Sequence, residues 1–290
     1  MNDQAQGLRT KLQRQSIART IGVVSGKSGL GTSNFSVNMC TILAKANKKV
    51  LLLNLDFGMA NVHLPSGENP ERTIMDFLNE NIEVHEIVHK GSDGVSYISG
   101  GTGLSSCVNW PKEKFDRFAD GLQFLQQYYE YIFFDMGALA SKDRLDLMMT
   151  LDETILITTP EPTDIMDAYS LIKHISLLGG EQELYIVCNR AQSEKQGEET
   201  LSRLQGVVRK FLQKKVSILG IIMDDTNVGE AVANQVPYSI QYPNHPAARG
   251  LAAIAMSYLA TPPLNCESSS LKFTFIDKLR KLFIVKGEVG

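Results

Sequence analysis

Cysteine is scarce in this 290-residue sequence, and its cysteines form no C-x-x-C pair. They lie far apart in the chain, at Cys40, Cys107, Cys188 and Cys266. This spacing provides neither a zinc site nor a disulfide framework, and it fits a reducing cytoplasm. The sequence also lacks any run of about 18 apolar residues that would span a bilayer. Its first 19 residues are polar and basic, without the apolar stretch of a secretory signal. We therefore expect a cytoplasmic protein, at most peripheral on the inner face of the cell membrane.

Charge of one sign is not abundant either. The formal net charge is −3, which argues against a protein that binds nucleic acid over its whole surface. The five histidines show no metal-ligand spacing. A hydrophobic content of 43% with 21% charged residues is ordinary for a folded globular protein and excludes extensive disorder.

Apolar runs alternate with helix-like segments along most of the chain. Such runs indicate strands buried on both faces, as in a parallel sheet covered by helices. The predicted strands are Ile21–Ser25, Val50–Leu55, Val95–Ile98, Tyr131–Asp135, Thr154–Thr158, Leu184–Asn189 and Ile218–Ile222. The predicted helices of this region are Ser33–Ala46, Lys112–Tyr129, Thr163–Leu178, Gly197–Gln213 and Pro246–Leu259. This order predicts an α/β fold with a doubly wound, mostly parallel sheet flanked by helices.

The composition divides the chain into four segments. Residues 20–260 form the predicted α/β domain, and residues 1–19 carry a short polar helix, expected over Asp3–Gln15. Residues 261–270 are rich in proline and serine and are predicted to be a linker. Residues 271–290 contain a last helix, expected over Lys272–Lys286.

The first predicted strand leads into a glycine-rich turn, Ser25-Gly26-Lys27-Ser28-Gly29-Leu30-Gly31-Thr32-Ser33-Asn34, and then into a helix. Such a turn binds phosphate, because glycines let backbone N–H groups surround phosphate oxygens and the helix N-terminus adds its dipole. The phosphate-loop pattern G-x-x-x-x-G-K-[ST] fits residues 26–33, except that Thr32 stands at the lysine position. The alternative interpretation is a plain tight turn.

Polar residues stand at the ends of four other predicted strands. They are Asp56, Asp135, the pair Asn189-Arg190 and the pair Asp224-Asp225. Each of these alone would be interpreted as a solvated side chain at a strand end. Their succession along a series of strands and helices makes chance a poor explanation.

These motifs resemble those of the MinD/ParA family of P-loop ATPases and, within it, the FlhG (YlxH) branch of flagellar regulators. The family carries K-G-G-x-G-K-[ST], whose first lysine reaches the partner's nucleotide in an ATP-sandwich dimer, and Lys27 matches that lysine. The resemblance implies ATP and Mg²⁺ as cofactors. It also implies that the nucleotide is contacted by the loop residues Gly26, Lys27, Gly29, Leu30, Gly31, Thr32 and Ser33.

The same resemblance assigns roles to residues downstream of the loop. Ser33 and Asp135 would hold Mg²⁺, Asp135 through water. Residues 52–61 resemble the family's D-x-D-x-G-x-x-N segment, in which Asp56 matches the carboxylate that orients the attacking water. Lys27 and Asp56 are therefore the candidate catalytic residues. The segments that resemble the family's adenine contacts contain Asn189, Arg190 and Asp225.

The sequence departs from the family pattern at three positions, with Thr32 for lysine, Ser28 for glycine and Asn54 for aspartate. A lysine on the phosphates makes charged hydrogen bonds worth about 1.5–3 kcal/mol each. Its loss should weaken nucleotide binding roughly ten- to a hundredfold, and it removes charge that stabilises the transferring phosphoryl group. We expect retained but weakened ATP binding, with slow or absent hydrolysis.

Near its start the sequence resembles the D-Q-A-x-x-L-R motif of FlhG proteins. The matching residues are Asp3, Gln4, Ala5, Leu8 and Arg9. The resemblance implies that this helix binds and stimulates an FlhF-type GTPase of the signal-recognition-particle class. It further implies flagellar switch and C-ring proteins as partners, and an ATP-dependent homodimer. No nucleic-acid partner is expected, and the alternative for the motif itself is a disordered polar tail.

The last predicted helix is basic and amphipathic. This character suits an anionic membrane surface, at about 1 kcal/mol per cation near the lipid. The candidate membrane-binding residues are Phe275, Ile276, Lys278, Leu279, Leu282 and Phe283. The alternative is a terminal helix packed on the domain.

The sequence thus predicts an ATP-binding regulator of flagellar number or position that acts as a membrane-associated switch. A non-hydrolysing adaptor of the same fold is the main alternative, favoured by Thr32 and Asn54. A ParA/MinD-type positioning ATPase acting on another cargo is a second alternative, and its DNA-partition form is opposed by the net charge. An iron–sulfur relative is opposed by the absence of paired cysteines.

Overall fold

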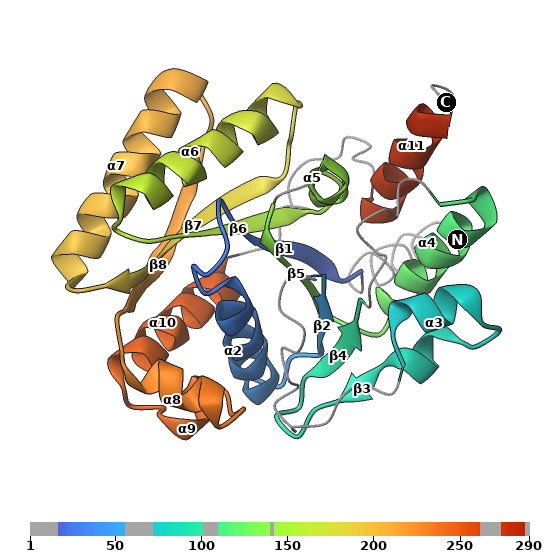
Figure 1. The fold of residues 1–290 in the computed structure, drawn as a ribbon, viewed down its shortest axis with the longest axis horizontal. Helices are drawn as coiled ribbons and strands as arrows, with labels where there is room; N and C mark the ends of the chain where they lie inside the picture. Colours follow the sequence, from blue (N-terminus) through green and yellow to red (C-terminus); the bar gives the residue numbers. More distant parts are fainter. Residues whose placement is uncertain (1–16, 56–71, 101–109, 140–141, 262–273, 288–290) are drawn as a thin grey trace, which may run out of the picture.

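The computed structural model describes residues 17–55, 72–100, 110–139, 142–261 and 274–287. The strands in this part of the chain form one eight-stranded sheet in the order β3-β4-β2-β5-β1-β6-β7-β8 (Figure 1). They are β1 (Arg19–Ser25), β2 (Val50–Asn54), β3 (His89–Lys90), β4 (Ser96–Ser99), β5 (Tyr131–Ala138), β6 (Glu153–Thr158), β7 (Glu183–Ala191) and β8 (Ser217–Met223). Neighbours pair in parallel, except that β3 is antiparallel to β4 at the edge. The predicted doubly wound, mostly parallel α/β fold is confirmed.

Helices cover both faces of the sheet. They are α2 (Thr32–Lys45), α3 (Ile74–Asn79), the 3-10 helix η1 (Val84–Ile87), α4 (Lys112–Leu125), α5 (Lys142–Met148), α6 (Pro162–Leu177), α7 (Glu194–Leu212), α8 (Asn227–Ala233), α9 (Tyr238–Gln241), α10 (Pro246–Ala260) and α11 (Phe275–Gly287). Buried side chains of α2, α8, α9 and α10 fill the core on one face. Those of α3 to α7 and of α11 fill the core on the other.

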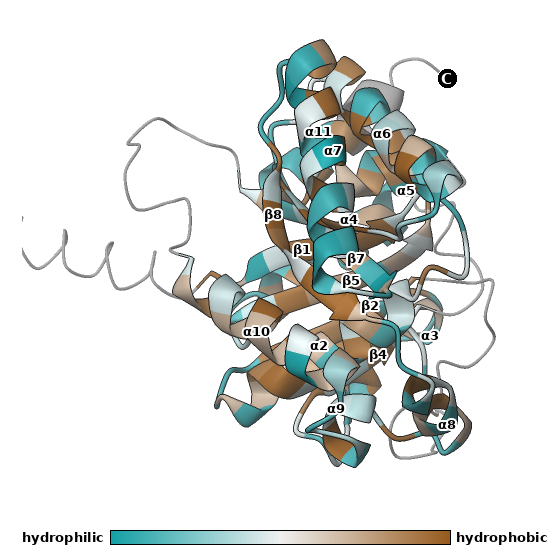
Figure 2. Cartoon of the chain, turned by 90° about the vertical axis from the view of Figure 1, so that its left-hand side faces the viewer, coloured by the Kyte–Doolittle hydropathy of each residue, from teal (hydrophilic) through white to brown (hydrophobic). Residues whose placement is uncertain are grey.

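The alternation of side chains along each strand explains why the strand sequences are apolar throughout. In β2, Leu51 and Leu53 belong to one core, whereas Leu52 belongs to the other. Successive side chains of a strand point to opposite faces, so a strand covered on both faces needs an apolar residue at every position. Figure 2 shows this arrangement, with hydrophobic residues along the sheet and hydrophilic residues on the outer side of α7.

Each predicted strand and helix that falls within the described residues corresponds to an element of the structure, with ends shifted by a few residues. The predicted helix over Asp3–Gln15 lies outside the described residues and stays a prediction. The short elements β3, α3, α5, α8 and α9 were not predicted. No described helix is long and apolar enough to cross a membrane.

Helix α11 packs on the domain with its apolar face inward. Phe275, Ile276 and Leu279 are buried, with 2%, 6% and 0% of their surface exposed. The ring of Phe275 lies 5.8 Å from the ring of Phe134 in β5. Sequence analysis assigned this face to a membrane, with packing on the domain as the alternative. The structure shows the packed arrangement, in which α11 lies against α4 and Phe275 contacts Phe134 of β5.

The polar side of α11 is also engaged by the domain. Arg280 Nη2 lies 2.6 Å from Asp120 Oδ1 of α4, and Arg280 Nη1 lies 3.9 Å from Asp116 Oδ1. Leu282 is partly buried against the same core, and Lys278 is partly exposed. The Phe283 side chain lies outside the described part of the chain, and membrane binding through this helix stays a prediction.

Candidate functional site

The glycine-rich turn lies at the C-terminal end of β1, in the middle of the sheet. Strands β2 and β5 lie on one side of β1, and β6, β7 and β8 lie on the other. The crossover connections therefore leave in opposite directions around β1. In doubly wound sheets, ligands bind at this kind of reversal, outside the carboxyl ends of the strands.

The backbone of the turn has the geometry of a phosphate cradle. Gly29 and Gly31 have φ of 84° and 91°, a region that glycine adopts readily and other residues rarely. A Cβ at Gly29 would point into open space, whereas one at Gly31 would lie 2.5 Å from Nδ2 of Asn189. Gly31 is also the N-cap of α2 and supplies no side-chain acceptor for the first N–H groups of that helix. These N–H groups fit a bound phosphate.

Contacts from other strands hold the turn in place. Asn189, near the end of β7, donates from Nδ2 to the Leu30 carbonyl at 2.8 Å. Ser25 Oγ donates to the Lys27 carbonyl at 2.7 Å. These contacts fix the backbone of the turn, and a fixed glycine-rich turn at a helix N-terminus can accommodate the phosphate tail of a nucleotide.

Lys27 forms an ion pair with Asp164, a residue in the first turn of α6 that sequence analysis did not identify. The lysine side chain is 47% exposed, whereas Asp164 is 3% exposed and also accepts from Thr159 Oγ1 at 2.6 Å. Burial raises the pKa of Asp164, but hydrogen bonds from Lys27 and Thr159 outweigh it and hold the pKa below its ordinary value. The hydrogen bond to Asp164 raises the pKa of Lys27.

The same helix approaches the first residue of the turn. A Cβ at Gly26 would lie 2.5 Å from Cβ of Asp167 in α6, so this position requires glycine. The polar stretch after β6, from Thr159 to Asp164, was the sequence signal that could have pointed to Asp164. In the described part of the site, the turn is thus bordered by carboxylates on α6, and its lysine is paired.

The residues assigned to Mg²⁺ come from α2 and β5. Thr32, at the missing lysine position, is 6% exposed and opens α2, and Ser33 follows it partly exposed. Asp135 is 1% exposed in β5, the strand next to β1. The pairing of Ser25 with Ala138 brings the end of β5 beside the start of the turn. Hydroxyl and carboxylate oxygens are donors that Mg²⁺ prefers, so Ser33 and Asp135 have the chemistry to hold it.

A bulge follows Asp135. The pairing register between β1 and β5 shifts there, so that Val23 pairs with Asp135 and the next residue of β1 pairs with Gly137. Gly137 has φ of 58°. Arg144 of α5 donates from Nη1 to the carbonyls of Met136 at 3.3 Å and Ala138 at 3.2 Å. Arg144, which sequence analysis did not identify, therefore holds the backbone that carries Asp135.

The residues assigned to the adenine end lie beyond β7 and β8. Arg190 is exposed and has φ of 57°, and its N–H donates to Asn189 Oδ1 at 3.0 Å. Asp225 accepts from Asn227 N–H at 3.0 Å and lies 3.7 Å from His245 Nδ1. Burial raises the pKa of Asp225, but the hydrogen bonds from Asn227 outweigh it and the net shift is downward. Asp225 therefore orients the loop between β8 and α8.

Several assigned residues lie outside the described part of the chain. They are Asp56 and the N-terminal motif residues Asp3, Gln4, Ala5, Leu8 and Arg9. The last described residue before Asp56 is Leu55, whose N–H donates to the Asp135 carbonyl at 2.8 Å.

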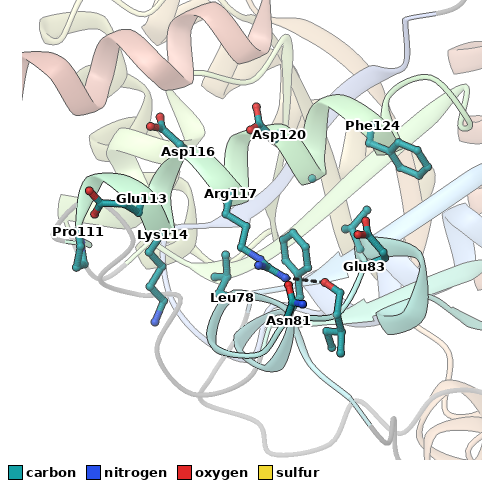
Figure 3. Close-up of a pocket in the computed structure, with 14 residues that line it drawn as sticks. Leu78, Asn81, Glu83, Pro111, Glu113, Lys114, Asp116, Arg117, Asp120 and Phe124 are labelled. Carbon is teal, nitrogen blue, oxygen red and sulfur yellow. Dashed lines mark hydrogen bonds between the residues drawn. The ribbon is translucent and has the colours of Figure 1, made fainter.

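A separate groove of about 790 Å³ lies between α4 and the α3–η1 segment (Figure 3). Arg117 crosses its floor, donating to the Ile82 carbonyl at 2.6 Å with its guanidinium 4.7 Å from the centre of the Phe77 ring. Asp116 and Asp120 line the groove where their carboxylates pair with Arg280 of α11. None of the residues assigned to the site from the sequence lines this groove.

The parallel sheet and the glycine cradle at β1 define a nucleotide-binding α/β protein. The chain belongs to the CobQ/CobB/MinD/ParA nucleotide binding domain family, whose model matches residues 21–238. This match includes the phosphate loop, Asp135 and Asp225.

Two relatives are similar to nearly the whole chain. Antiactivator FleN of Pseudomonas aeruginosa is 27% identical over 261 residues, which is 90% of this chain and 93% of FleN. Flagellum site-determining protein YlxH of Helicobacter pylori is 27% identical over 274 residues, covering 90% and 89%. Among solved structures, the septum site-determining protein MinD of Pyrococcus horikoshii, complexed with Mg-ADP, superposes with a TM-score of 0.66 at 21% identity, covering 83% of this chain and 96% of that one.

Proposed function

We propose that the chain is an ATP-binding regulator of flagellar number or position, acting as a nucleotide-dependent switch. The family match supports the nucleotide, and the names of the two relatives, an antiactivator and a flagellum site-determining protein, support the flagellar role. The single observation that carries the nucleotide part is the cradle formed by Gly29, Gly31 and the N-terminus of α2.

Binding is expected to be weak and hydrolysis slow. Thr32 is neutral where a phosphate-loop lysine would stand, and the charge of Lys27 is balanced by Asp164. The site therefore offers phosphate oxygens backbone N–H groups and little net positive charge. When Mg²⁺ is bound it supplies the missing positive charge, and Ser33 and Asp135 are the residues that would hold it.

The decisive experiment is equilibrium binding of ATP with Mg²⁺ to the full chain and to Thr32→Lys. Restoring the lysine should raise affinity roughly ten- to a hundredfold and raise the rate of phosphate release. Asn34→Lys adds the same charge in the same first turn of α2, away from the lysine position, and serves as the control. Equal turnover in the parent chain and in Thr32→Lys would contradict the proposed defect, and absence of binding in both would contradict the nucleotide site.

A non-hydrolysing adaptor of the same fold is the second candidate. The pairing of Lys27 with Asp164 favours it, because a lysine held within its own chain contributes nothing to a partner's nucleotide. An adaptor would show no change in assembly state on adding ATP, whereas the switch would.

The N-terminal motif is the proposed binding site for a protein partner. We assign Asp3, Gln4, Ala5, Leu8 and Arg9 to an FlhF-type GTPase, and we expect flagellar C-ring proteins as further partners. Leu8→Asp in the full chain should remove stimulation of that GTPase, whereas Gln6→Asp, which adds the same charge at a non-matching position, should not. Stimulation that survives Leu8→Asp would exclude this assignment.

Membrane attachment through α11 requires the helix to leave α4. Phe275, Ile276 and Leu279 are buried there, so the lipid-facing and the docked arrangements exclude each other. Deleting residues 271–290 should lower binding to anionic liposomes at least about tenfold, with the melting temperature of the variant measured alongside. Unchanged liposome binding by the folded variant would rule this attachment out.

A further inference from the structure

The C-terminal ends of α6 and α7 form one exposed surface, at the edge of the sheet opposite the phosphate turn. The two helices pack side by side (Figure 1). Lys214, just after α7, donates from Nζ to the carbonyl of Gly180, just after α6. Each end is stopped by a left-handed residue, Gly179 with φ of 74° and Gln213 with φ of 52°. The α6/α7 end consists of Leu177, Leu178, Arg209, Lys210, Phe211 and Lys215.

This surface exposes large apolar side chains that nothing in the described chain covers. Leu177 is 76% exposed, Leu178 49% and Phe211 64%. Single exposed apolar residues are common, but three at one place, from two helices tied together, form a patch. The patch is made of helix ends, so it projects from the surface.

The charge of the surface is opposite to that of the whole protein. Between positions 203 and 215 the sequence carries five cations and no carboxylate, in a chain of net charge −3. Arg209, Lys210 and Lys215 are exposed, and Lys210 Nζ lies 5.2 Å from the centre of the Phe211 ring. Glu181 and Glu183 are the carboxylates that act on the neighbouring Lys214.

We propose that the α6/α7 end binds an anionic lipid surface. Cations attract the headgroups while an exposed aromatic ring and two leucines enter the boundary of the acyl chains. Nucleic acid would satisfy the cations equally well. It would leave Leu177 and Leu178 in water, because it offers no apolar layer to receive aliphatic side chains.

Helix α6 connects this surface to the phosphate site. Helix α6 begins beside the turn, where Asp164 holds Lys27, and ends at Leu177. Its 16 residues span about 24 Å at 1.5 Å per residue. A membrane held at the α6/α7 end therefore leaves the phosphate site facing away from the lipid. The contact also differs from that of α11, whose apolar face is buried.

The test uses the full chain and vesicles of phosphatidylglycerol with phosphatidylcholine, compared with phosphatidylcholine alone, in a flotation assay. Phe211→Ser and Lys210→Glu should each lower binding to the anionic vesicles at least about tenfold. Both side chains are exposed, and the melting temperatures of the variants should match that of the parent. All variants retain residues 271–290, so any contribution of α11 is the same in each.

Two controls match these changes. Met256→Ser removes an apolar side chain that is 65% exposed on α10, and Lys195→Glu reverses an exposed charge at the other end of α7. Neither should change vesicle binding. Three results would overturn the proposal: no binding to anionic vesicles, equal loss in test and control variants, or binding of a short DNA duplex that these variants abolish while vesicle binding persists.

Discussion

At the scale of single residues, the charge of the phosphate turn depends on one ion pair. Lys27 is half-exposed and Asp164 is buried, so the carboxylate is fixed in place and the lysine is drawn to it. The aspartate is also held by Thr159 and is part of the start of α6. The turn and α6 are thereby joined through side chains, and removing the charge on Asp164 should affect both.

We expect this pair to make stability depend on pH. The folded-state pKa of Asp164 is depressed, so its contribution is present above the unfolded-state value and is lost as pH falls through the folded value. As pH falls from about 5 to about 2, the parent chain should therefore lose more stability than Asp164→Asn. Thermal melts across this range provide the measurement, with Glu198→Gln on α7, an exposed acid, as control. Parallel curves for parent and Asp164→Asn would contradict the prediction.

Arg144 gives a second prediction at this scale. Its guanidinium binds the carbonyls on both sides of Gly137 and so fixes the bulge after Asp135. Arg144→Ala should weaken the Mg²⁺-dependent part of nucleotide binding by up to about tenfold, corresponding to about 1.4 kcal/mol. Affinity measured with Mg²⁺ and with a chelator separates this part from the rest. Arg203→Ala, on the exposed side of α7, should change neither value, and an equal loss with and without Mg²⁺ would show a purely structural role.

At the scale of elements, α11 shows why a sequence pattern can fit two environments. Its apolar face is the same whether it meets lipid or α4, because burial against either surface removes the same apolar side chains from water. The two environments differ only in the surface that the helix packs against, and the sequence of the helix itself does not contain that information. Here Phe134 of β5 and the acids Asp116 and Asp120 of α4 provide that surface.

This packing predicts a measurable contribution to stability. Phe275→Ala should destabilise the folded chain by about 3–5 kcal/mol, the usual cost of removing a buried phenylalanine. Phe211→Ala, which truncates an exposed ring on α7, should change stability by less than about 0.5 kcal/mol. Denaturant unfolding of the two variants provides the comparison. Equal stabilities would mean that α11 is free of the domain in solution.

The sequence predicted the long elements well, for a physical reason. Strands buried on both faces must be apolar throughout, as in β2 and β5, and amphipathic helices such as α7 show their period over several turns. Helices of four to seven residues, such as α3, α5, α8 and α9, are too short for a period to appear. Local signals are limited to single caps, such as the capping box of Thr73 and Asp76 that begins α3.

Some residues of the candidate site were likewise predicted from the sequence and others were missed. The glycines of the turn are recognisable because the local backbone requires them, and Asp135 because a carboxylate follows an apolar run. The structure extends β5 past Asp135 to Ala138. Asp164 and Arg144 were missed because their roles arise through space, from contacts with Lys27 and with the backbone after Asp135. A sequence pattern reflects the local structure of its own segment, whereas Asp164 and Arg144 stabilise segments that are distant in the sequence.

At the scale of the whole molecule, the rim of the phosphate site is suited to a second copy of the chain. Met166 of α6 is 69% exposed, two residues beyond Asp164. A large apolar side chain exposed on the helix whose first turn holds Lys27 is unfavourable at a free surface and favourable at an interface. The family resemblance implies that such a dimer encloses nucleotide between the two copies, with Lys27 reaching across.

We therefore expect ATP with Mg²⁺ to shift the chain from monomer to dimer in sedimentation velocity, and Met166→Asp to weaken that dimer at least about tenfold. The charge would have to be desolvated in the interface, whereas in the monomer it is solvated. Met256→Asp adds the same charge at an equally exposed methionine on α10 and should have no effect on assembly. A dimer that forms without nucleotide, or one that tolerates Met166→Asp as well as Met256→Asp, would place the contact between copies on another face of the molecule.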